Sequence, residues 1–109
     1  MTSAQLRCLL ACQELCPTGE SIASKEIAVH LHLSRPSVHR LLEALVLKGL
    51  VEKEPYGTVS FSERGRLVAA SVKQKHERML EAVRGISELS EAEAEEGAYL
   101  LVSCMDFDS

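Results

Sequence analysis

The chain of 109 residues has no apolar run that approaches the roughly 20 residues of a membrane-spanning helix. It begins Met-Thr-Ser-Ala-Gln, without the basic and apolar segments of a secretion signal. Both absences predict a cytoplasmic protein with no membrane partner. The length is typical of one domain, and 46% hydrophobic residues suffice for one modest core.

Signatures of catalysis are also missing. The sequence contains no Gly-rich phosphate loop, no nucleophile elbow and no HExxH motif. The acidic residues near the C-terminus are more typical of an exposed helix face than of a catalytic cluster. We therefore predict that the protein is not an enzyme.

Lysine and arginine are absent from residues 87–109, which hold seven acidic residues. Residues 1–86 therefore contain all 12 basic residues and nine acidic ones, a net charge of +3, although the whole chain has a net charge of −4. This separation of charge is compatible with a phosphate-facing surface on the N-terminal part.

The four cysteines form no CxxC pair, which argues against a zinc finger, and no structural disulfide is expected without an export signal. Cys8, Cys12 and Cys16 are spaced to line one face of a helix. Their overlap with its apolar stripe favours core packing. The alternative is a thiol or metal sensor, since sulfur and imidazole suit zinc or Cu(I). Its candidate residues are Cys8, Cys12, Cys16, His76 and Cys104.

Hydrophobic spacing in the first half predicts three helices. The first covers residues 3–16, and the second covers residues 24–33 with Ser24 as its N-cap. The third begins at Ser34, whose hydroxyl can cap it, and ends at Gly49. Its apolar residues recur at helical spacing and are expected to face the core: Val38, Leu41, Leu42, Leu45 and Val46.

Two short strands and two more helices complete the chain. Residues 50–54 and 58–61 are expected to form strands around a turn at Pro55-Tyr56-Gly57. Ser62 caps a long helix over about residues 63–84, whose apolar side includes Leu67. A capping box at Ser90-Glu91-Ala92-Glu93 starts the last helix, about residues 91–105.

This order predicts a mainly α fold, a winged helix-turn-helix of three helices and a two-stranded β-wing followed by two C-terminal dimerisation helices. Residues 1–62 are expected to form the DNA-binding region. Residues 63–109 are expected to form the helical dimerisation region, within one compact domain overall.

The start of the third helix is the expected DNA-reading surface, because that end of a reading helix enters the major groove. Arginine can bind guanine through two hydrogen bonds, and serine hydroxyls suit phosphate oxygens. The residues expected to contact double-stranded DNA are Lys25, Ser34, Arg35, Pro36, Ser37, His39, Arg40, Lys53 and Tyr56. The alternative is a winged-helix module that binds another protein instead, since Glu52 and Glu54 dilute the charge of the wing.

Six short motifs occur in order: Glu26-Ile27-Ala28, Leu33-Ser34-x-Pro36-Ser37-Val38, Leu45-x-x-x-Gly49-Leu50-Val51, Tyr56-Gly57, Ser62-Glu63-x-Gly65 and His76. On these motifs the chain resembles the iron- and manganese-dependent repressors, the family of the diphtheria toxin repressor, over about residues 3–105. The resemblance implies a homodimer held by the first and the C-terminal helices. It also implies palindromic operators, repression when Fe²⁺ or Mn²⁺ is bound, and DNA contacts at Ser34, Pro36 and Arg40.

The metal ligands of that family match at His76 alone. The other ligand positions hold different residues: Arg7 (or Ala4 with a shift of one turn), Leu80, Tyr99, Val102 and Ser103. One histidine cannot hold a hard divalent ion. We therefore expect a degenerate site with His76 as a packing residue, although the resemblance by itself implies Mn²⁺, Fe²⁺ or Zn²⁺.

Overall fold

The computed structural model describes residues 1–16, 20–86 and 88–105. Its elements follow one another as α1 (Ser3–Leu15), β1 (Ile22–Ala23), α2 (Ser24–Leu31), α3 (Arg35–Leu47), β2 (Val51–Glu54), a 3-10 turn (Pro55–Gly57), β3 (Thr58–Phe61), α4 (Glu63–Arg84) and α5 (Glu91–Ser103). The predicted fold class, a winged helix-turn-helix followed by two helices, is confirmed.

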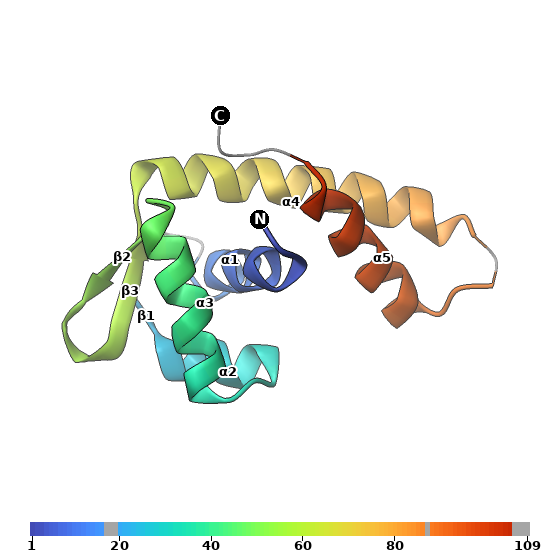
Figure 1. The fold of residues 1–109 in the computed structure, drawn as a ribbon. Helices are drawn as coiled ribbons and strands as arrows, with labels where there is room; N and C mark the ends of the chain where they lie inside the picture. Colours follow the sequence, from blue (N-terminus) through green and yellow to red (C-terminus); the bar gives the residue numbers. More distant parts are fainter. Residues whose placement is uncertain (17–19, 87, 106–109) are drawn as a thin grey trace.

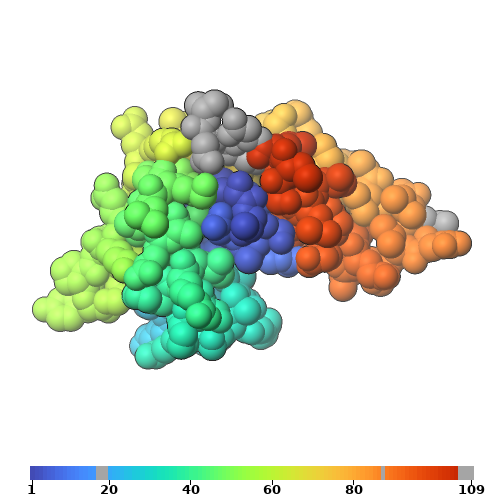
Figure 2. Space-filling view, in the orientation of Figure 1, coloured from blue at the N-terminus to red at the C-terminus, as the bar shows by residue number. Residues whose placement is uncertain are grey.

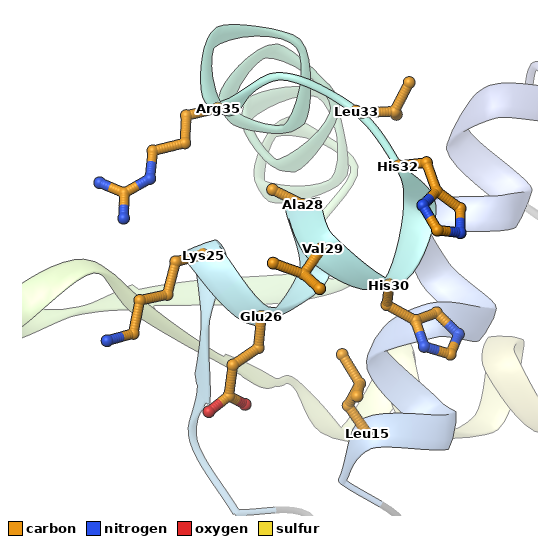
Figure 3. Close-up of a pocket in the computed structure, with 9 residues that line it drawn as sticks. All are labelled: Leu15, Lys25, Glu26, Ala28, Val29, His30, His32, Leu33 and Arg35. Atoms are coloured by element: carbon orange, nitrogen blue, oxygen red, sulfur yellow. The ribbon is translucent and has the colours of Figure 1, made fainter.

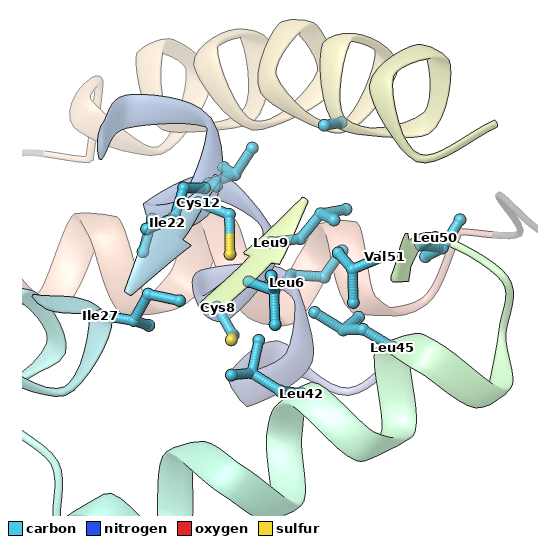
Figure 4. Close-up of a cluster of buried hydrophobic side chains, with 14 of the residues drawn as sticks. Leu6, Cys8, Leu9, Cys12, Ile22, Ile27, Leu42, Leu45, Leu50 and Val51 are labelled. Carbon is cyan, nitrogen blue, oxygen red and sulfur yellow. The ribbon is translucent and has the colours of Figure 1, made fainter. Parts of the chain in front are cut away.

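Helix α1 lies at the centre of the molecule, where it contacts α2, α3, α4 and α5 (Figure 1). A capping box fixes its start, since the Gln5 amide donates to Thr2 Oγ1 at 3.1 Å and the Thr2 amide donates to Gln5 Oε1 at 3.1 Å. Its apolar residues meet those of the other elements in one continuous core (Figure 4). The fully buried side chains include Leu6, Cys8, Leu9, Cys12, Ile27, Leu45 and Leu50.

The helix-turn-helix is formed by α2 and α3, with a tight turn between them. His32 occupies the left-handed region at φ 56°, which ends α2 and redirects the chain. Ser34 caps α3 as predicted, because its Oγ accepts a hydrogen bond from the Ser37 amide at 3.3 Å. Gly49, at φ 74°, follows the helix. The prediction that Ser24 caps α2 is wrong: the N-cap is Ala23, which is held extended by pairing with β3.

The sheet has three strands in the order β1-β3-β2, all antiparallel, where the sequence predicted two. The additional strand is Ile22–Ala23, in which Ile22 lies opposite Val59. Two residues are too few for an alternating pattern, so this strand leaves no periodic signal. Its pairing ties the start of α2 to the wing.

The start of α4 packs closely against Leu50, the residue that precedes β2. The Ser62 amide donates to the Leu50 carbonyl at 3.1 Å, and Ser62 Oγ caps α4 by accepting from Gly65 N–H at 2.9 Å. A Cβ on Gly65 would lie 1.7 Å from the Leu50 oxygen, so this position excludes any side chain. Leu67, expected on the apolar side, is instead 69% exposed.

Helices α4 and α5 pack against each other and extend beyond the winged helix. Val83 from α4 and Ala94 and Ala98 from α5 are buried. In the space-filling view, α1 is visible between the helix-turn-helix on one side and α5 on the other (Figure 2). Within residues 1–16, 20–86 and 88–105, no helix is both long and apolar enough to cross a membrane.

Candidate nucleic-acid interface

The first turns of α3 present polar side chains to solvent. Arg35, Pro36, His39 and Arg40 are exposed, and Ser37 is half-buried. The apolar residues of the same helix point inward, with Val38, Leu42 and Leu45 buried and Leu41 and Val46 partly buried against the core. The start of the helix therefore offers an accessible edge that combines cations and hydroxyls.

Lys25 and Arg35 belong to one open groove of about 840 Å³ along α2 and the turn. Figure 3 shows both side chains projecting to the same side, while His30 and His32 lie at the opposite end. The floor between them is apolar, and Val29 is 76% exposed. Sequence reasoning missed the two histidines, although their place at the end of α2 is the signal that could have indicated them.

Arg40 lies apart from this groove. Together with Ser37 it lines a second, smaller depression of about 330 Å³, where α3 meets the start of α1. Arg40 lies five positions after Arg35, which places the two on different sides of a helix with 3.6 residues per turn. The structure thus divides the predicted DNA-contacting residues of α3 between two edges of the same surface.

Glu43 links the reading helix to the wing. Its Oε1 lies 3.0 Å from His39 Nε2 and 3.4 Å from Lys53 Nζ. All three side chains are about half exposed, so these contacts are weak. Two predicted DNA contacts, His39 and Lys53, therefore share one carboxylate that a phosphate would have to replace.

The tip of the wing carries both a protruding aromatic ring and a fixed negative charge. Tyr56 is fully exposed and adopts a left-handed conformation at φ 65°. Hydrogen bonds from the hydroxyls of Ser21, whose Oγ lies 2.7 Å from Glu54 Oε1, and of Ser60 lower the pKa of Glu54. Glu54 thus stays ionised, which limits phosphate contact at this point of the wing.

A second cluster of polar groups lies where α1, α4 and α5 meet. The His76 ring stacks on Tyr99 with 4.0 Å between ring centroids. The guanidinium carbon of Arg7 lies 4.2 Å from the Tyr99 centroid, and Arg7 also forms an ion pair with Glu96. We call Arg7, His76, Glu96 and Tyr99 the junction cluster. It unites three of the positions that the repressor resemblance assigns to metal ligands.

Comparisons with known proteins agree with this architecture. Residues 6–55 match the model of the IclR helix-turn-helix domain. A solved structure of the manganese regulator SloR is similar over 94% of this chain and 47% of that chain, with a TM-score of 0.76 and 24% identity. This chain thus spans about half the length of that regulator. No curated protein matches it by sequence.

The chain is a winged-helix protein with a DNA-binding helix-turn-helix domain. The likeness to SloR establishes the shared fold, and residues 6–55 are similar to the IclR helix-turn-helix domain. The predicted class, a DNA-binding transcriptional regulator, is therefore confirmed at the level of this domain.

The residues of the junction cluster do not fit a divalent metal ion. In the part of the chain that the structure describes, no three His, Cys, Asp or Glu side chains gather in a way that could hold one. His76 is 7% exposed, and its Nε2 is buried without a hydrogen-bond partner among these residues. Val102 is buried in the core, and Ser103 Oγ donates to the Leu100 carbonyl. The expectation of His76 as a packing residue agrees with its stacking on Tyr99.

Burial lowers the pKa of His76, and the charge of Arg7 lowers it further, while Glu95, Glu77 and Glu14 oppose the shift. A neutral imidazole suits the face of the Tyr99 ring without a counter-charge. Burial also raises the pKa of Tyr99. Both rings of the junction cluster are thus uncharged near neutral pH, and the positive charge comes from Arg7.

Among the described residues, the cysteines do not gather into a group that could hold a metal ion. Cys8, Cys12 and Cys16 are buried along α1, whereas Cys104 is exposed at the end of α5. A hydrogen bond with Cys8 and burial strongly raise the pKa of Cys12, which keeps its thiol protonated and unreactive. Cys16 Sγ donates to the Glu20 carbonyl at 2.9 Å. Core packing, the favoured interpretation from the sequence, accounts for all three buried thiols.

Proposed function

We propose that this protein is a transcriptional repressor that binds palindromic double-stranded DNA as a homodimer, in the cytoplasm. The observation that carries the proposal is the capped α3 helix, whose exposed basic start lies beside the wing within a segment that matches a helix-turn-helix domain. Residues 1–62 bind DNA, and residues 63–109 bring two copies together. The nine predicted residues around Arg35 and Arg40 are the proposed contacts.

A homodimer is supported by apolar side chains that one copy leaves uncovered. Leu100 and Leu101 on α5 are 52% and 48% exposed, and Leu67 on α4 is 69% exposed. Burial of such apolar surface is favourable by about 25 cal/mol per Å², and these leucines do not gain it while they are exposed. A second copy that covers α5 would recover part of it and would present two reading helices to two half-sites.

We propose that this protein shares its scaffold with the metal-dependent repressors, but not their metal site. The shared features are the order of elements, the His76 position on α4 and the fold similarity to SloR. The donor set of the junction cluster argues against a bound Mn²⁺, Fe²⁺ or Zn²⁺ as the effector. We therefore place this protein among regulators that keep the scaffold without the usual metal ligands.

The test is selection of bound duplexes from a random DNA pool, followed by affinity measurements with Arg35→Ala, Arg40→Ala and the exposed α4 control Arg78→Ala. Loss of a base contact is expected to weaken specific binding by about 1–3 kcal/mol, whereas Arg78→Ala leaves it unchanged. Because Arg35 and Arg40 line different depressions, their ranking identifies the edge of α3 that faces the bases.

Salt separates this function from its rival, a protein-binding winged helix. Affinity for DNA is expected to fall by orders of magnitude between roughly 50 and 200 mM salt, because phosphate contacts release counterions. A selection that enriches no sequence, together with equal weak binding by all three variants, would instead favour the protein-binding module.

A further inference from the structure

The junction cluster joins three helices through one positive charge. Arg7 extends from α1 to α5, where its guanidinium lies over the Tyr99 ring and pairs with Glu96. Tyr99 in turn stacks on His76 of α4. Each helix thus contributes one member to a continuous stack, and removal of the guanidinium would remove the contacts of Arg7 with Tyr99 and Glu96 on α5.

The surroundings of this charge are acidic. Glu14 from α1, Glu77 from α4 and Glu95 from α5 all act electrostatically on the His76 ring, and Arg7 is the positive charge that opposes them. A meeting point of helices with this excess of carboxylates is stabilised by a cation. Guanidinium suits the place, since it pairs with a carboxylate and stacks on an aromatic face at the same time.

We infer that Arg7 is the built-in cation of this junction and a positioning residue for DNA binding, in place of a divalent metal ion. Its guanidinium fixes α5 against α1, and thereby fixes the C-terminal helices relative to the reading helix that packs on the other side of α1. The role in DNA binding rests on the function proposed above, whereas the effect on the protein alone does not. DNA affinity is therefore independent of added or removed divalent metal.

The test compares wild type with Arg7→Lys, Arg7→Met and the control Arg78→Met, in the absence of DNA. Arg7→Met keeps the aliphatic stem but removes the charge, and it is expected to lower Tm by about 4–8 °C. Arg7→Lys should retain most of the wild-type Tm, because an ammonium also interacts with the ring and with Glu96. Arg78→Met is expected to stay within about 2 °C of wild type.

Hydrogen exchange locates the effect of Arg7 in the structure, and metal titration tests whether a divalent ion takes part. In Arg7→Met, amides of α5 are expected to exchange faster while those of α3 keep their protection. Excess MnCl₂, excess ZnCl₂ or EDTA should leave the Tm of wild type unchanged, since a bound ion would stabilise the native state. If Arg7→Met does not fold, the Tm of Arg7→Lys and the metal titration of wild type still test the inference.

An unchanged Tm and unchanged α5 exchange in Arg7→Met would overturn the inference, as would a rise in the wild-type Tm with Mn²⁺ or Zn²⁺. These measurements do not involve DNA, so they stand apart from the selection and the α3 variants that test the proposed function. Once a bound sequence is known, Arg7→Met should lower affinity at least about tenfold, with Arg7→Lys close to wild type and EDTA without effect on either.

Discussion

The winged helix and the C-terminal helices are held together in different ways. Around α1, aliphatic side chains such as Leu9 and Leu45 are completely buried, and the backbone approaches so closely at Gly65 that no side chain fits. Between α4 and α5 the buried residues are small, and polar groups of the junction cluster add to the contact. Large apolar side chains there remain exposed.

This difference indicates two sources of stability. The winged helix buries large apolar side chains, which contribute about 1.5–3 kcal/mol each, in a core that Val72 of α4 and Val102 of α5 also enter. The C-terminal helices bury alanines and valines and leave leucines in solvent, so we expect their stability to depend on Arg7 and on the proposed second copy.

The largest effect is expected from Gly65→Ala, which would disrupt the close contact between the start of α4 and Leu50 of the winged helix. The added Cβ would overlap the Leu50 carbonyl, so unfolding free energy should fall by about 3 kcal/mol or more. Gly97→Ala in α5 is the matched control, because its Cβ would lie 3.6 Å from Val83 and would favour the helix. Chemical denaturation measures both, and equal stability of the two variants would contradict the close approach at Gly65.

Next, Leu45→Ala tests the core around α1. Leu45 is fully buried, and its truncation is expected to cost about 2–5 kcal/mol, whereas Leu47→Ala, two residues later and 88% exposed, should change stability by less than about 0.5 kcal/mol. Thermal and denaturant unfolding give the comparison. Similar losses from both would mean that α3 does not pack as described.

Replacement of Leu100 and Leu101 by serine sharpens the distinction between the two regions. We expect the dimer dissociation constant to rise by at least about tenfold, with little change in the stability of the winged helix. Sedimentation as a function of protein concentration measures the dimer dissociation constant. Hydrogen exchange in α3 measures the stability of the winged helix. A wild-type protein that stays monomeric at every concentration would remove the proposed role of α5.

The smallest effect concerns pH and His76. Its native pKa lies below the ordinary value of 6.5, so below that pH the unfolded chain binds a proton that the native protein does not. The contribution of neutral His76 to the free energy of unfolding is complete above about pH 6.5, and it is lost as the pH falls toward the lower native pKa. His76→Gln should flatten this part of the stability curve. An identical slope in both proteins would show that carboxylates alone cause the decline.

Much of the fold was predictable from local signals. Ser34, Ser62 and the Ser90 capping box each start a helix where the sequence predicted one. These signals are local, because a cap depends on hydrogen bonds within one turn. The strand at Ile22–Ala23 and the displaced cap at Ala23 were missed, since both depend on pairing with a strand over 30 residues away.

The candidate sites were predictable in composition but not in arrangement. Sequence alone identified the basic start of α3, yet it gave no indication that Arg35 and Arg40 line different depressions or that Glu43 bridges His39 and Lys53. Such relations depend on the angle between α2, α3 and the wing. Nothing in the local pattern encodes that angle.

By itself, the sequence determined the order of elements, the helix boundaries set by capping, and the mismatch at the metal-ligand positions. Only the tertiary structure decided that Arg7, His76 and Tyr99 meet, because they lie on three helices separated by up to 92 positions and are joined by packing around α1. Side-chain identity fixes which chemistry is available. The packing of helices fixes which side chains come close enough to use it.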